Sequence, residues 1–182
     1  MPLSDVTLLQ LGVGQNARLA ALKSGVVEAG IFVPPVTRVA RRQGFYPMLD
    51  MSKEKFEYAG TAIAVSGQSL REKPEMVERF LRAYIAGIHY AKTHKEESMR
   101  ITARYMKLDP DKDRASLEET YNIFIQDVVQ RKPYPSLPGI QRVLDQIAET
   151  DPKAKTAKPE HFVDTRLLTE LDRSGFIDGL YK

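Results

Sequence analysis

The chain has 182 residues, 42% of them hydrophobic, which is enough to bury a core in one or two compact units. It has no cysteine, which excludes a disulfide scaffold, a thiol nucleophile and thiolate metal sites. Its 27 basic and 24 acidic side chains are interleaved and leave a net charge of +3, so the charge pattern does not favour a nucleic-acid partner.

Apolar segments alternate with short helical segments in the first fifty residues. Residues 6–11, 26–33 and 45–51 favour strands, because apolar and β-branched side chains dominate them. Helices are predicted at 17–24 and 36–43, and glycines or prolines separate several of these elements. Strands that alternate with helices are typical of a parallel sheet with helices on its faces. We therefore predict an α/β fold for this part of the chain.

Beyond residue 51 the pattern becomes mostly helical. Residues 51–57 are polar and are predicted to cross between two lobes, and 58–65 are predicted to return as a strand. Further helices are predicted over residues 74–90, 95–106, 116–129, 138–150, 159–171 and 176–181. The first of these carries apolar residues at three- and four-residue spacing: Val77, Phe80, Leu81, Tyr84, Ile85 and Ile88.

Three stretches, in this order, carry a family resemblance. The first runs from Leu19 to Ala29 and continues through Pro34-Pro35 to Gln43-Gly44-Phe45. The second is Lys73–Tyr84, and the third is Asp164–Asp178. Together they resemble the periplasmic solute-binding proteins of ABC importers. The nearest branch is the nitrate, sulfonate and taurine type, which also contains binders of thiamine-pyrimidine precursors.

The resemblance implies a partial periplasmic-binding-protein fold of type II, because the chain resembles only the C-terminal part of such a protein. Residues 1–50 would be part of the second lobe with its parallel sheet, 51–57 the crossing segment, and 58–182 the mostly helical part of the first lobe. The implied ligand is a small anionic or heterocyclic solute in an interlobe cleft, and the implied partner is an inner-membrane ABC permease. The implied location is periplasmic or extracytoplasmic, although this sequence opens without a signal peptide. We expect the isolated chain to bind such a ligand poorly.

Two loops follow strand ends and open onto helix N-termini, where parallel sheets commonly bind ligands: residues 12–16 and 34–37. The residues predicted to bind the ligand are Gln15, Asn16, Pro34, Thr37, Gly60 and Thr61. Several residues of these segments have a structural alternative. Asn16 can be an N-cap, Pro35 can open a helix, and Gly60 can mark a bulge. Arg18 can pair with an anion, although a solvated arginine is commoner.

No catalytic residue, metal ligand set or cofactor motif is predicted. His89 and His94 are five residues apart, which places them on different sides of a helix, and His161 stands alone. We expect the protein not to be an enzyme. Two alternatives remain: an enzyme of pyrimidine-precursor biosynthesis, and the effector-sensing domain of a regulator.

The apolar face of helix 74–90 and the strand at 58–65 lack an evident partner in this sequence. An uncovered apolar face beside an open strand edge favours self-association. Partial disorder of the helical part is the alternative.

Overall fold

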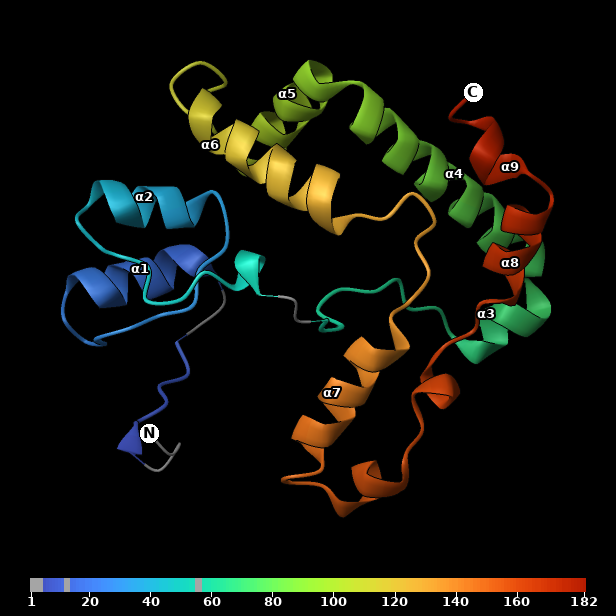
Figure 1. Ribbon diagram of the computed structural model, residues 1–182, viewed down its shortest axis with the longest axis horizontal. Helices are drawn as coiled ribbons and strands as arrows, with labels where there is room; N and C mark the ends of the chain where they lie inside the picture. Colours follow the sequence, from blue (N-terminus) through green and yellow to red (C-terminus); the bar gives the residue numbers. More distant parts are fainter. Residues whose placement is uncertain (1–4, 12–13, 55–56) are drawn as a thin grey trace.

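A computed structural model describes residues 5–11, 14–54 and 57–182 (Figure 1). The described chain is a succession of helices. The α-helices are α1 (Gln15–Lys23), α2 (Val36–Arg42), α3 (Gly67–Glu72), α4 (Pro74–Thr93), α5 (Lys95–Met106), α6 (Arg114–Thr120), α7 (Leu137–Ile147), α8 (Arg166–Arg173) and α9 (Phe176–Gly179). Short 3-10 helices lie at η2 (Met51–Lys53), η4 (Pro152–Thr156) and η5 (Pro159–Phe162), and η3 (Tyr121–Val128) is a π-helix that continues α6.

The predicted parallel sheet is wrong: the described residues form no strand and no sheet. The segments predicted as strands are irregular connections instead. Side chains of α1 bind the backbone of one of them, since Val33 N–H donates to Gln15 Oε1 at 2.6 Å and Arg18 Nη1 donates to Ile31 O at 3.2 Å. Polar groups that a neighbouring strand would bind are therefore satisfied by a helix.

Residues 14–45 nevertheless form a small packed unit of two helices, drawn in blue in Figure 1. α1 and α2 contact each other, and Leu19, Val36 and Ala40 form the buried core between them. Phe32 and Phe45, from the connections on either side of α2, pack against this core. Both predicted helices thus contribute buried side chains to a core, although the described residues form no sheet.

The long helix α4 organises the rest of the molecule. The C-terminal helices α8 and α9 pack against it through a core of Ile85, Leu168, Leu171 and Ile177. Pro74 occupies the first turn, as predicted, where its missing N–H costs no hydrogen bond. The C-terminal helices cover only part of the apolar face, because Phe80 and Tyr84 remain exposed.

A second helical core lies at the other end of α4, where the chain turns back through α5, α6 and η3 (Figure 1). Its buried residues are Met99, Ala103, Leu117 and Tyr121. α5 has the bounds that the sequence predicts, and it ends at Lys107 in the left-handed conformation. Leu108 N–H then donates to Ala103 O at 2.9 Å, which closes the helix end.

The segment after residue 57 docks on α7. Glu57 accepts a hydrogen bond from the Ser136 hydroxyl, and the Tyr58 hydroxyl donates to Gln146 Oε1 at 3.0 Å. Gly139 faces this segment so closely that a Cβ there would lie 3.0 Å from Ala59 N and 3.2 Å from Tyr58 C. A glycine is therefore needed for the close approach of the two backbones.

No helix in the described ranges is long and apolar enough to cross a membrane.

Candidate functional site

Gln15 and the turn before α2 are brought together. Because Gln15 is the first residue of α1, its side chain reaches the Val33 amide, the residue directly before Pro34. The helix begins two residues earlier than an Asn16 cap would allow: Gly14 is the N-cap, and no side chain caps the helix. The N-cap interpretation of Asn16 is thus wrong, and its exposed side chain lies in the first turn. Gly12 and Val13, which complete this predicted opening, lie outside the described residues.

Pro34 and Thr37 belong to a buried turn. The Pro34–Pro35 peptide bond is cis, and Pro35 is the buried N-cap of α2, one position before the helix begins. The Thr37 hydroxyl and Arg38 Nε are buried atoms without a hydrogen-bond partner among the described residues. Arg38 Nη1 lies 3.8 Å from Glu119 Oε2, and this ion pair joins α2 to α6. The hydroxyl of Thr37 therefore has hydrogen-bonding capacity that this conformation does not use.

Arg18 is engaged within the protein. Its guanidinium donates to the Ile31 carbonyl, so it holds the connecting segment against α1. That contact favours the structural role over pairing with an anion.

Gly60 and Thr61 belong to a different segment of the chain from Gln15 and Thr37. Both are exposed in the segment between residue 57 and α3, and Gly60 N–H donates to Tyr58 O at 2.9 Å. No hydrogen bond or ion pair links either residue to Gln15 or Thr37 within the described part of the chain. The structure therefore unites the Gln15 and Pro34–Thr37 openings and leaves the return segment separate. Residues 55–56 of the predicted crossing segment lie outside the described residues.

Two surface cavities occur in the helical half. One, of about 250 Å³, lies between α5 and α6 and is lined by Glu96, Met99, Arg100, Pro110, Asp111, Arg114 and Leu117. The other, of about 120 Å³, lies beside α3, α4 and α8. None of the six predicted ligand residues lines either cavity.

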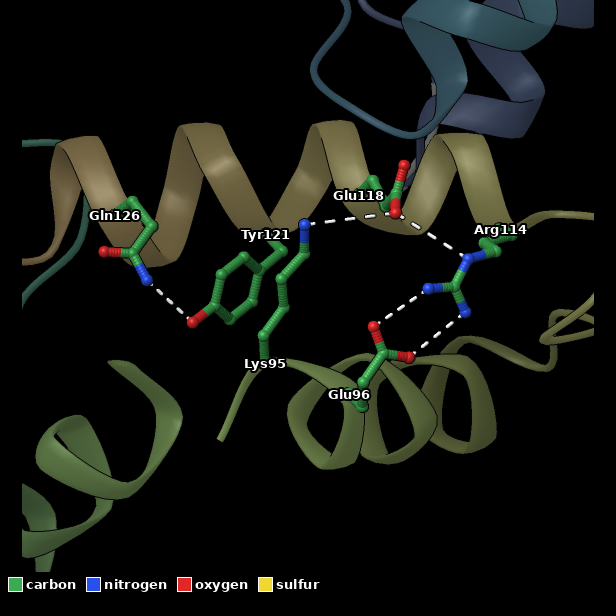
Figure 2. A network of polar contacts seen from close by, with 6 residues as sticks. All are labelled: Lys95, Glu96, Arg114, Glu118, Tyr121 and Gln126. Carbon is green, nitrogen blue, oxygen red and sulfur yellow. Dashed lines mark hydrogen bonds and ion pairs between the residues drawn. The ribbon is translucent and has the colours of Figure 1, made fainter. Parts of the chain in front are cut away.

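Two charged residues that line the larger cavity, Glu96 and Arg114, belong to the network of polar contacts in Figure 2. Arg114 grips the Glu96 carboxylate with two hydrogen bonds of 2.8 and 3.1 Å, and its Nε lies 3.7 Å from Glu118. This hydrogen bond holds the pKa of Glu96 below its ordinary value and raises that of Arg114. Lys95 approaches Glu118 from the other side at 3.9 Å. These four charges thus neutralise one another within the network.

This network was not predicted. The sequence places Glu96 and Arg114 eighteen residues apart, and adjacent acidic residues on a helix read as a solvated face. The packing of α5 against α6 brings Glu96 and Arg114 together, and no local sequence pattern predicts that packing.

No metal-binding cluster appears within the described residues, where no group of three or more histidine and carboxylate side chains could hold an ion. His89 packs edge-on against the Tyr181 ring at 4.7 Å, and His94 stacks on Tyr90 at 4.2 Å. These two histidines have aromatic neighbours that account for their positions.

Comparison with known proteins gives one family. A family model described as NMT1/THI5 like matches residues 1–98. A search of curated proteins found no match, and neither did a search of solved structures. The family match confirms the resemblance to the nitrate, sulfonate and taurine-binding branch of periplasmic solute-binding proteins, although it ends before the third resembling stretch. Members are mostly substrate-binding proteins, and one namesake is a biosynthetic, enzyme-like member. Because the match spans more than half of the 182 residues, the chain belongs to the NMT1/THI5-like family, and substrate binding is its general role.

Proposed function

We propose that the protein is the solute-binding component of an ABC-type importer and that it binds a small anionic or heterocyclic solute. The family match over residues 1–98 carries this proposal. It includes both openings at α1 and α2 and the segment with Gly60 and Thr61. The candidate classes of ligand remain sulfonates, nitrate, taurine and pyrimidine precursors.

The binding groups we propose come from the two openings and from the return segment. Gln15, Asn16 and Thr37 supply amide and hydroxyl groups, Pro34 shapes the turn, and Gly60 and Thr61 would approach from the other unit. The Thr37 hydroxyl is buried and has no hydrogen-bond partner among the residues that the structure describes, which supports this assignment, because a buried polar group normally has one. An oxygen or ring nitrogen of the ligand would be the hydrogen-bond partner of this hydroxyl.

The domain arrangement belongs to the same proposal. Residues 1–50 and 58–182 would act as two bodies joined by residues 51–57, with the solute held between them as they close. The contact between α1 and α2 and the separate helical cores of the later residues support such a division. The Arg38–Glu119 ion pair connects the two bodies, since Arg38 lies in α2 and Glu119 in α6. Delivery to an inner-membrane permease, and hence an extracytoplasmic location, follow from the importer role.

Protein-observed ¹H–¹⁵N NMR during titration with millimolar taurine, an alkanesulfonate, nitrate and an aminopyrimidine tests the proposal, because shifts of backbone amide signals detect weak binding. We expect one ligand class to bind and to shift the amide signals of Gln15, Val33 and Thr37. Thr37→Val removes the hydroxyl but keeps the shape, so it should weaken binding while leaving stability unchanged or slightly higher. Thr120→Val on α6 is the matched control, since its hydroxyl donates to Ser116 O away from the openings. Absence of binding by all four classes, or equal effects of the two variants, would refute the assignment.

A further inference from the structure

The larger surface cavity, between α5 and α6, combines apolar and charged lining residues. Met99 and Leu117 belong to the buried core beneath it, and Pro110 adds a third apolar side chain. Its volume of about 250 Å³ lies just below the ~300–1,000 Å³ of sites that hold drug-sized molecules. The cavity therefore has the size for a smaller molecule with a hydrocarbon part.

Asp111 places a carboxylate at this cavity that the network of Figure 2 does not hold. Its side chain forms no hydrogen bond or ion pair within the part of the chain that the structure describes. Arg114 also lines the cavity, but its guanidinium binds Glu96 and lies next to Glu118 instead. The backbone at Asp111 is fixed, because its N–H donates to Asp109 Oδ1 at 3.0 Å. A carboxylate is thus held at the cavity and can accept hydrogen bonds from a cation.

Arg100 on α5 supplies hydrogen-bond donors to the same cavity. Its Nη1 donates to Glu97 Oε2 at 3.2 Å, which is one bond of a guanidinium with five N–H groups. The two side chains of this ion pair are 70% and 45% exposed, and exposed pairs contribute little to stability. An anionic group in the cavity can therefore bind the remaining N–H groups without displacing a strong contact.

The charges of the lining residues are balanced, with Glu96 and Asp111 against Arg100 and Arg114. Because Glu96 and Arg114 bind each other, Asp111 and Arg100 are the two charged groups with capacity for a ligand. A simple anion would leave Asp111 without a counter-charge, and a simple cation would leave Arg100 with the exposed Glu97 alone. A molecule that carries both charges satisfies both residues.

We propose that this cavity binds a small zwitterion with a hydrocarbon body, of the chemical class of an aliphatic amino acid. Its ammonium group binds the Asp111 carboxylate, and its carboxylate binds the Arg100 guanidinium. The hydrocarbon body lies against Met99, Pro110 and Leu117. This inference goes beyond the proposed function and does not depend on it, because none of the six residues proposed to bind the solute lines the cavity.

Protein-observed ¹H–¹⁵N NMR of the full chain during titration with L-valine tests the site. The backbone amide signals of Arg100, Asp111 and Leu117 should shift with a Kd of about 1 mM, whereas those of Gln15 and Thr37 should stay in place. Isobutylamine and isovalerate keep the hydrocarbon body but lack the carboxylate and the amino group respectively, so each should bind about tenfold more weakly.

Three results of this titration would overturn the proposal. The first is the absence of shifts at the cavity amides with valine up to about 50 mM. The second is equal binding of valine and either single-charge compound. The third is a set of shifts confined to Gln15 and Thr37, which would place valine at the openings and leave the proposed function intact.

Two variants separate the roles of the charges. Asp111→Asn should weaken valine and isobutylamine about tenfold and leave isovalerate unchanged, and Arg100→Gln should weaken valine and isovalerate but not isobutylamine. Asp127→Asn is the matched control, because Asp127 is an exposed residue of η3 that does not line the cavity. Circular dichroism checks that all three fold, as expected for changes at exposed positions. Valine binding that either cavity variant leaves unchanged, or that Asp127→Asn weakens equally, would refute the assignment.

Discussion

Replacement of Tyr121 by phenylalanine should loosen the corner where α4 meets η3. The Tyr121 side chain is only 5% exposed. Its hydroxyl lies 3.0 Å from Ala91 O and 3.1 Å from Lys92 O, and it accepts a hydrogen bond of 2.6 Å from Gln126 Nε2 (Figure 2). Ala91 and Lys92 are in the last turn of α4, where carbonyls have no partner within the helix. The phenolic hydroxyl therefore closes a helix end from a distant part of the chain.

Loss of this hydroxyl removes a donor shared by the two helix carbonyls and an acceptor of the Gln126 amide in a partly buried place. Ala91 O keeps the Ser98 hydroxyl at 3.3 Å, and Lys92 O keeps Gln126 Nε2 at 3.3 Å. The expected loss is about 1–2 kcal/mol in the free energy of unfolding. For a chain of this size it corresponds to a fall of about 2–8 °C in the melting temperature. Thermal unfolding followed by far-ultraviolet circular dichroism measures it. Tyr105→Phe is the matched control, because Tyr105 is exposed, and its replacement should change stability by less than about 0.5 kcal/mol.

A double-mutant cycle with Gln126→Ala isolates the contact. The two changes should be less than additive, since each removes the same 2.6 Å hydrogen bond. The explanation is refuted if Tyr121→Phe unfolds at the wild-type temperature, or if Tyr105→Phe is equally destabilising.

Two further predictions concern other contacts. Gly139→Ala should destabilise the docking of residues 57–60 on α7 by about 1–2 kcal/mol, because its Cβ would press on the Ala59 backbone; limited proteolysis should show faster cleavage there, and unchanged cleavage would contradict the packing argument. The Glu96–Arg114 pair should be complete above the ordinary pKa of a glutamate and should be lost as the pH falls through the lowered pKa of Glu96. In Arg114→Gln, an NMR titration should find the pKa of Glu96 raised toward its ordinary value, whereas an unchanged pKa would show that the hydrogen bond is not the cause.

The helices of the second half were largely predictable. Apolar residues at three- and four-residue spacing place α4, and the α5 bounds match because charged and turn residues flank it. The predicted helix at 116–129 appears as α6 followed by the π-helix η3, since periodicity does not report a local change in hydrogen-bond register. The predicted helix at 159–171 is divided, with a 3-10 turn at its start and α8 beginning at Arg166.

The sheet could not be judged from periodicity alone. The run Ile31-Phe32-Val33 is apolar throughout, so its pattern does not indicate that Phe32 alone faces the core. It carries no information about the strand that would bind the backbone, and here Gln15 and Arg18 bind one edge instead. The same limit applies to the candidate site. Chain order brings Gln15 near Pro34, whereas the position of Thr61 depends on how residues 57–60 dock on α7, which involves contacts with residues almost eighty positions away.

The ends of α4 and η3 hold each other in both directions. Lys92 of α4 donates to the carbonyls of Ile125 and Gln126 in η3 at 2.5 and 3.2 Å, while Tyr121 and Gln126 of η3 bind carbonyls of α4. Fraying of either helix would remove hydrogen-bond partners from the other. Neither end can therefore open alone at low cost, and the two should melt as a single cooperative unit, even though almost thirty residues of chain separate them.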